Sequence, residues 1–266
     1  MVKAVPMSVR VAAALFLALT LLFVLGPLII VIGVSFTAGD YISFPPQGFS
    51  LRWYKAVLSS STYTGTALTS LWLAIAVTIS ATLIGAAAAI ALNRRLLPGS
   101  GAISTLFLAP LVLPTIVLAL GLLMFWSAWV GPTSFTVLWL GHTVIAIPYV
   151  VRTTLAVLST SDRFLEEAAR TMGAGPWKAL RHVTVPQALP GVAAGAFFAF
   201  NISFDEAILS LFLRSPEVVT LPIQIYTQLE FSPDPSIAAV STLMIMMTIL
   251  LIVVIDRILG IQRVAN

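Results

Sequence analysis

The segment FLEEAARTMGAGPWKALRHVTVPQALP, residues 164–190, is polar and carries charges of both signs, whereas most of the chain around it is apolar. Ser161 or Asp162 can cap a helix that starts here, because short polar side chains accept hydrogen bonds from the first backbone amides. Glu166 precedes Arg170 by four residues, which is the favourable order for a helical ion pair. The segment therefore predicts a helix that begins near residue 164.

The second half of this segment predicts a turn and a further short helix. Gly173 favours a helix end, because glycine readily adopts the left-handed backbone of a C-cap. Gly175-Pro176 can restart a helix, since proline is well suited to the first helical position. Trp177 and Leu180 would share one face of that helix. The whole loop, 159–186, is thus a charged helical hairpin between two apolar runs, and such a surface is suited to contact with another protein.

Composition restricts the class of protein. The chain has 266 residues, of which 59% are hydrophobic and 9% charged, and its mean hydropathy is +1.04. Because soluble domains carry about a quarter charged residues, we expect an all-α integral membrane protein in contact with lipid. The net charge of +4 does not indicate nucleic acid, since the basic residues lie beside apolar runs. The chain has no cysteine, which excludes disulfides, thiolate catalysis and cysteine metal sites.

Six apolar stretches are long enough to cross roughly 30 Å of hydrocarbon as helices. We expect one membrane domain over residues 1–266, with these spans at 11–36, 64–92, 102–126, 135–158, 187–213 and 237–259. The first run is too long for the core of a cleaved signal peptide, so we expect it to remain as a helix. Between the first two spans, residues 51–58 favour a short helix at the membrane interface.

Proline and histidine inside the spans have two interpretations each. Pro110 and Pro114 favour a bend in the third span, either as a packing kink or as a hinge beside a transport path. His142 in the fourth span is more typical of a hydrogen-bonded interior residue than of a metal ligand, so we expect no metal site.

The distribution of basic residues predicts the orientation. Six spans place both termini on one side, and the positive-inside rule identifies that side as cytoplasmic. Only three of the 14 basic residues then fall outside, namely Arg52, Lys55 and Arg214. The eleven on the inner side are Lys3, Arg10, Arg94, Arg95, Arg152, Arg163, Arg170, Lys178, Arg181, Arg257 and Arg263.

A cluster of polar residues interrupts the fifth span in the sequence AFNISFDEAILSLF. Two adjacent carboxylates are costly in lipid and usually face protein or water. Three interpretations remain open: a cation site in a translocation path, a gate, or a helix break whose acids pair with a partner subunit. The residues of this candidate path or gate are Asn201, Ser203, Phe204, Asp205 and Glu206.

The loop 159–186 resembles the EAA loop of the membrane subunits of binding-protein-dependent ABC importers. The resemblance rests on Glu167-Ala168-Ala169, on Gly173 four residues later, and on Val183, Val185 and Pro186 at the expected spacing. It implies the type I importer permease fold, with a cytoplasmic coupling helix that sits in a groove of the ATP-hydrolysing subunit. The coupling residues it implies are Glu166, Glu167, Ala168, Ala169, Arg170 and Gly173.

Further segments, GFSLRWY, SFDE and LPIQIYTQLEFSPDPSIAAVST, are similar to spermidine/putrescine importer permeases, particularly the second of their two membrane subunits. The family tends to carry two aspartates where this chain has Asp205-Glu206. The resemblance implies an inner-membrane, non-catalytic subunit for import of a small molecule, with a polyamine favoured over amino-acid-like, phosphonate or metal cargo.

The resemblance also implies partners. These are a second homologous permease, two ATP-binding subunits and an extracytoplasmic solute-binding protein. No G-x-x-x-x-G-K-[ST] sequence occurs here, so ATP and Mg would be bound by the partner ATPase subunits. Two rival classes are an ion-coupled carrier, which needs no docking helix, and an intramembrane hydrolase built on Ser203, His142 and Asp205.

Overall fold

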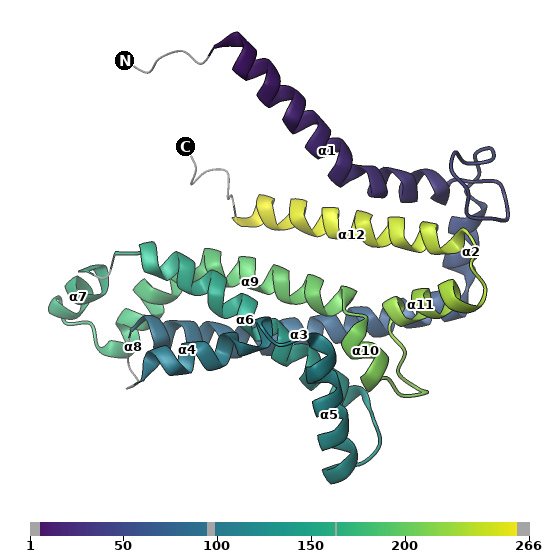
Figure 1. Ribbon diagram of the computed structural model, residues 1–266. Helices are drawn as coiled ribbons and strands as arrows, with labels where there is room; N and C mark the ends of the chain where they lie inside the picture. Colours follow the sequence, from purple (N-terminus) through teal and green to yellow (C-terminus); the bar gives the residue numbers. More distant parts are fainter. Residues whose placement is uncertain (1–5, 95–98, 163, 260–266) are drawn as a thin grey trace. The chain divides into compact units, whose positions relative to one another are not determined.

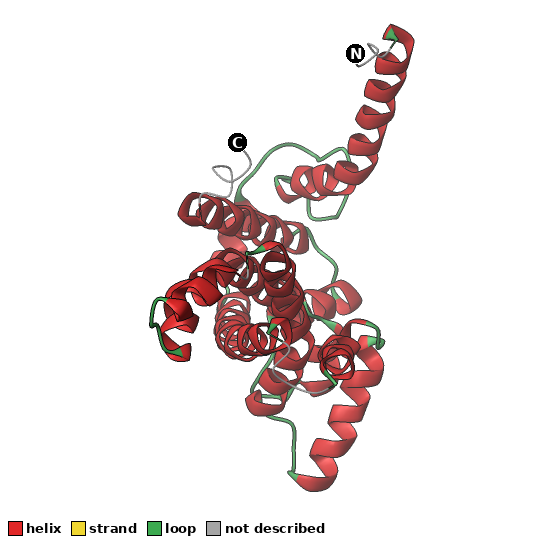
Figure 2. Cartoon of the chain, turned by 90° about the vertical axis from the view of Figure 1, so that its left-hand side faces the viewer, coloured by secondary structure: helices red, strands yellow, loops and turns green. Residues whose placement is uncertain are grey.

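The computed structural model describes residues 6–94, 99–162 and 164–259, and in these ranges the regular structure is helical, with no strand longer than an isolated bridge (Figure 2). Some of the basic residues that predict orientation lie outside the described residues, namely Lys3, Arg95, Arg163 and Arg263.

Five of the helical stretches are long and apolar enough to cross a membrane, and a bent pair of helices makes a sixth crossing if it counts as one span. The expectation of an all-α membrane protein is confirmed. The five are α1 (Met7–Ser35), α3 (Ser61–Asn93), α6 (Phe135–Thr160), the continuous helical stretch Pro176–Asp205, and α12 (Ser236–Leu259).

The third predicted span, 102–126, falls on a bent pair of helices. It consists of α4 (Ser100–Leu108), the 3₁₀ turn η1 (Ala109–Leu111) and α5 (Thr115–Trp129), with a bend of 97° at the break (Figure 1). Pro114 lies directly before α5, and a proline disfavours helical backbone in the residue that precedes it. The bend expected from the prolines is therefore present, as a full break of the helix.

The helix at the fifth predicted span, 187–213, begins before residue 187 and ends before residue 213. It runs from α8 (Pro176–Ala179) through a π-helical turn, η2 (Leu180–Thr184), into α9 (Val185–Asp205). After a break, α10 (Ile208–Leu213) forms a separate short helix. The segment that follows contains α11 (Leu221–Phe231).

Glycines allow α6 and α9 to pack closely. A Cβ atom on Gly191 would lie 2.7 Å from the carbonyl oxygen of Thr153, and one on Gly195 would lie 2.7 Å from Cα of Val150. These two glycines are four residues apart, which is the small-residue spacing that lets membrane helices approach backbone to backbone. The pair belongs to the compact unit made of residues 65–224 and 248–266, whose buried apolar core is formed mainly by side chains of α3, α6 and α10.

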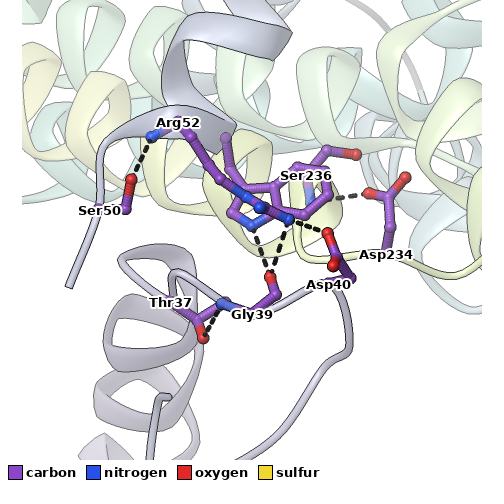
Figure 3. A network of polar contacts seen from close by, with 8 residues as sticks. Thr37, Gly39, Asp40, Ser50, Arg52, Asp234 and Ser236 are labelled. Atoms are coloured by element: carbon purple, nitrogen blue, oxygen red, sulfur yellow. Dashed lines mark hydrogen bonds and ion pairs between the residues drawn. The ribbon is translucent and has the colours of Figure 1, made fainter. Parts of the chain in front are cut away.

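The other compact unit comprises residues 1–64 and 225–247, and includes α2 (Arg52–Ser59), the short helix expected at 51–58. Figure 3 shows how its loop is tied to α2: Arg52 pairs with Asp40 and donates to the carbonyl oxygen of Gly39. Trp53 also donates to that oxygen, over 3.2 Å. These contacts hold the Pro- and Gly-rich loop against the start of α2.

Candidate functional site

The predicted docking loop begins with a capped helix, α7 (Phe164–Thr171). The Asp162 carboxylate accepts a hydrogen bond from the backbone amide of Phe164, 2.8 Å away, and so caps the helix as one of the two expected candidates. Glu166 and Glu167 lie in the first turn, where negative charge is favoured by the helix dipole.

The turn after α7 has the geometry expected from its glycine. Gly173 has a φ of 92°, in the left-handed region. Its amide donates to the carbonyl oxygen of Arg170, and the amide of Ala174 donates to that of Ala169. This pattern closes the helix end. Pro176 occupies the first turn of α8, as predicted.

Large apolar side chains of α7, α8 and the turn between them are exposed. Phe164 is 74% exposed, Met172 83% and Trp177 73%. Glu167, Ala168 and Arg170 are exposed as well, whereas Ala169 is half-buried. In Figure 1, α7 and α8 stand at one end of the long helices of their own compact unit. We call these six exposed residues the docking patch: Phe164, Glu167, Ala168, Arg170, Met172 and Trp177.

Glu166 differs from the docking patch because its carboxylate has partners within the chain. The guanidinium of Arg94, just after α3, lies 2.7 Å from Glu166 Oε2, and Thr184 Oγ1 of η2 donates to the same oxygen over 2.6 Å. Arg94 also donates to Thr184, over 3.0 Å. Among the described residues the ion partner of Glu166 is thus Arg94, and the predicted partner Arg170 acts on it only through its charge.

These contacts set the protonation of Glu166. Partial burial alone would raise the pKa of its carboxyl, but the hydrogen bonds from Thr184 and Arg94 and the nearby positive charge lower it below the ordinary value of 4.5. Glu166 is therefore ionised at neutral pH. Nothing in the local sequence indicates the Arg94 contact, because 72 residues separate the two side chains and only the fold brings them together.

The second candidate site lies where α9 ends. Ser203 and Phe204 are buried, and Asn201 donates its side-chain amide to the carbonyl oxygen of Phe197. The helix stops after Asp205, and Glu206 is extended, so the two carboxylates lie at a break and not within a continuous helix. The interpretation that the helix breaks here is confirmed; a pairing of these acids with a partner subunit stays a prediction.

The two carboxylates have different surroundings. Glu206 Oε1 accepts a hydrogen bond from the amide of Leu209, 3.0 Å away, and so caps the start of α10. Asp205 is exposed and makes no hydrogen bond or ion pair with any described residue. Of the pair, Asp205 is the carboxylate that is available to a ligand.

His142 of α6 is completely buried and hydrogen-bonded, as expected from its interior position. Its Nδ1 lies 3.1 Å from Ser203 Oγ and its Nε2 lies 3.0 Å from Ser210 Oγ. A hydrolase triad would need a carboxylate on the nitrogen that does not face the nucleophile. A second serine occupies that position instead of Asp205, which argues against the hydrolase.

The family described as binding-protein-dependent transport system inner membrane component matches residues 81–263, and the chain belongs to it. The chain is therefore a non-catalytic, multi-pass membrane subunit of an ABC importer, and an ion-coupled carrier is excluded.

Two relatives of known class are similar to this chain in sequence, and one solved structure is similar to it in fold. The spermidine/putrescine transport system permease protein PotC of Escherichia coli (strain K12) is 30% identical over 85% of this chain and 86% of its own length. A putative 2-aminoethylphosphonate transport system permease protein, PhnV of Salmonella typhimurium (strain LT2), is 26% identical over 93% and 92%. A bacterial alginate ABC transporter, crystallised with an alginate-bound periplasmic protein, has a chain of the same fold, with a TM-score of 0.69, 14% identity, and coverage of 93% and 91%.

Proposed function

We propose that this chain forms half of the path by which a small organic cation, a polyamine or a related amine, crosses the inner membrane. A second, homologous permease supplies the other half, and an extracytoplasmic solute-binding protein delivers the cargo. Two partner subunits bind ATP and Mg²⁺, and their hydrolysis of ATP drives the transport cycle.

The observation that carries the cargo proposal is the exposed, unpaired carboxylate of Asp205. Among the described residues the two ion pairs join Arg52 to Asp40 and Arg94 to Glu166, and neither involves Asp205. An unpaired carboxylate near lipid is costly unless it faces protein or water. Beside a water-filled path it attracts cations and repels anions. The similarity to a spermidine/putrescine permease supports the same class of cargo.

A second cargo is supported by the relative named for 2-aminoethylphosphonate. That molecule carries an ammonium group that Asp205 can pair with, but also a phosphonate, which needs a cationic partner. Arg214 follows α10 and is exposed, so it is the nearest candidate in sequence for such a partner. Competition between the two solutes separates these cargoes.

The docking patch is the second part of the proposal. Exposed Trp177 and Met172 are suited to a hydrophobic groove, and Glu167 and Arg170 to polar contacts at its rim. We assign the groove to the ATP-binding subunit, and this assignment places the loop and both termini in the cytoplasm. The bias of the basic residues supports the same orientation.

The test is uptake of radiolabelled spermidine into proteoliposomes that contain the whole complex. Asp205→Asn should lower uptake at sub-saturating spermidine about 10- to 150-fold, since a charged hydrogen bond contributes about 1.5–3 kcal/mol. Glu217→Gln is the matched control, because it removes an exposed carboxylate of the same unit outside the site. Assembly and basal ATPase should be unchanged in both variants.

Two results would contradict the cargo proposal. If Asp205→Asn and Glu217→Gln take up spermidine equally well, the carboxylate is structural. If unlabelled 2-aminoethylphosphonate competes with the label and putrescine does not, the path belongs to the phosphonate and not to a polyamine.

A further inference from the structure

The hydrogen bonds around His142 join the two sides of the break that presents Asp205. Ser203 lies in the last turn of α9, and Ser210 lies in α10, beyond the break. His142 contacts both from α6, and all three side chains are buried, with exposures of 0% to 2%. One imidazole therefore bridges the end of one helix and the start of the next.

The hydrogen bonds continue from Ser210 to the backbone. Ser210 Oγ donates its hydrogen to the carbonyl oxygen of Glu206, 2.8 Å away, and a carbonyl can only accept. On the other side of the ring, His142 Nδ1 lies 3.1 Å from Ser203 Oγ. The result is a continuous relay of hydrogen bonds that joins Ser203, His142, Ser210 and the Glu206 carbonyl.

The relay ends on the backbone of the residue next to Asp205. Glu206 is held twice, because its carbonyl oxygen accepts from Ser210 and its carboxylate accepts from the amide of Leu209. The helix α10 also packs closely against α6, because a Cβ on Gly141 of α6 would lie only 2.8 Å from Leu209 Cδ2 of α10. Because Gly141 has no side chain, α10 can approach α6 closely enough for His142 to reach Ser210.

We propose that His142 is a positioning residue for the cargo carboxylate: through its hydrogen bonds to Ser203 and Ser210, it holds the break between α9 and α10 and so fixes the direction of Asp205. His142 does not contact the cargo. Its effect on transport rests on the proposed cation function, whereas its effect on α10 does not.

Three substitutions of His142 separate the two arms of the relay, which are its hydrogen bonds to Ser203 and to Ser210. The side-chain amide of His142→Gln reaches the place of Nε2 and can still hydrogen-bond to Ser210. The shorter amide of His142→Asn lies near Nδ1 and keeps only the Ser203 arm. His142→Leu keeps neither. Like His142→Asn, Ser210→Ala removes the hydrogen bond between positions 142 and 210. It does so with the loss of a single oxygen, so it remains informative if a larger change prevents folding.

The whole complex is tested in proteoliposomes, with hydrogen exchange of the α10 amides and spermidine uptake as two readouts. In His142→Leu, His142→Asn and Ser210→Ala, we expect exchange in α10 to be about tenfold faster, as for loss of one buried hydrogen bond. The half-saturating spermidine concentration should rise by about the same factor, with the maximal rate within about twofold of wild type. His142→Gln should stay near wild type in both readouts.

Unchanged α10 exchange in both His142→Leu and Ser210→Ala overturns the relay, whatever the cargo is. Faster exchange with an unchanged half-saturating concentration overturns the positioning role, provided that Asp205→Asn impairs uptake in the same assay. If Asp205→Asn has no effect, the cation proposal fails by itself, and α10 exchange alone decides whether His142 holds the break.

Discussion

The contact between Arg94 and Glu166 makes a quantitative prediction about how the docking loop is attached. Arg94→Gln, Glu166→Gln and the double variant form a thermodynamic cycle. The two side chains are 19% and 26% exposed, so the ion pair is shielded more than an ordinary surface pair. A charge-assisted hydrogen bond in such surroundings contributes about 1.5–3 kcal/mol, against about 0.2–1 kcal/mol for an exposed pair.

The two single variants should lose different amounts of unfolding free energy. Removal of the Glu166 charge leaves the Arg94 guanidinium without its counter-ion, and its buried Nε already has no hydrogen-bond partner among the described residues. Removal of Arg94 leaves Glu166 with the hydroxyl of Thr184. We therefore expect Glu166→Gln to cost about 2–3 kcal/mol and Arg94→Gln about 1–2 kcal/mol. The double variant should cost less than their sum.

The free energies come from unfolding of the purified chain in mixed micelles at neutral pH. Arg170→Gln is the control, because Arg170 acts on Glu166 through charge without an ion-pair contact. A coupling energy below about 0.5 kcal/mol would refute the argument, since independent sites add within that limit. Equal losses in the control and in Arg94→Gln would also refute it.

The same contact predicts a dependence on pH. The pKa of Glu166 is lower in the folded chain than its ordinary value of 4.5, so its contribution to stability is complete above about pH 4.5 and is lost as the pH falls through the folded-state pKa. The difference in stability between wild type and Glu166→Gln should therefore shrink on acidification. A difference that grows at low pH would show that the sign is wrong.

Three further predictions concern packing, coupling and orientation. Gly195→Ala should destabilise the chain by about 1–3 kcal/mol, because the new Cβ meets the α6 backbone, whereas Gly121→Ala, in open space within α5, should not destabilise it in the same unfolding assay. Gly173→Val should lower the solute transported per ATP, because it strains a left-handed residue, while Gly175→Val, at a φ of −64°, should not. Reporter insertions after Gly175 and near Pro46 should be cytoplasmic and external respectively, and the reverse would contradict both the orientation and the docking role.

Local patterns in the sequence were sufficient for the helices and for the ends of the docking loop. Apolar runs of more than 20 residues predict spans because lipid offers backbone groups no hydrogen-bond partners. Gly173 and Pro176 mark a turn through their own backbone preferences, and the structure has that turn where expected. The prolines near residue 110 likewise predicted a bend, but local preference could not decide between a kink and a break of 97°.

Only the tertiary structure decided which polar groups meet. Arg94 and Glu166, or His142 with Ser203 and Ser210, are far apart in sequence, and no periodicity relates them. Their contacts depend on how closely the helices approach. That approach is set by glycines such as Gly195, where even one added methyl group would meet backbone atoms. The adjacent acids at 205 and 206 look equivalent in the sequence, but the fold gives one of them a helix to cap and leaves the other exposed.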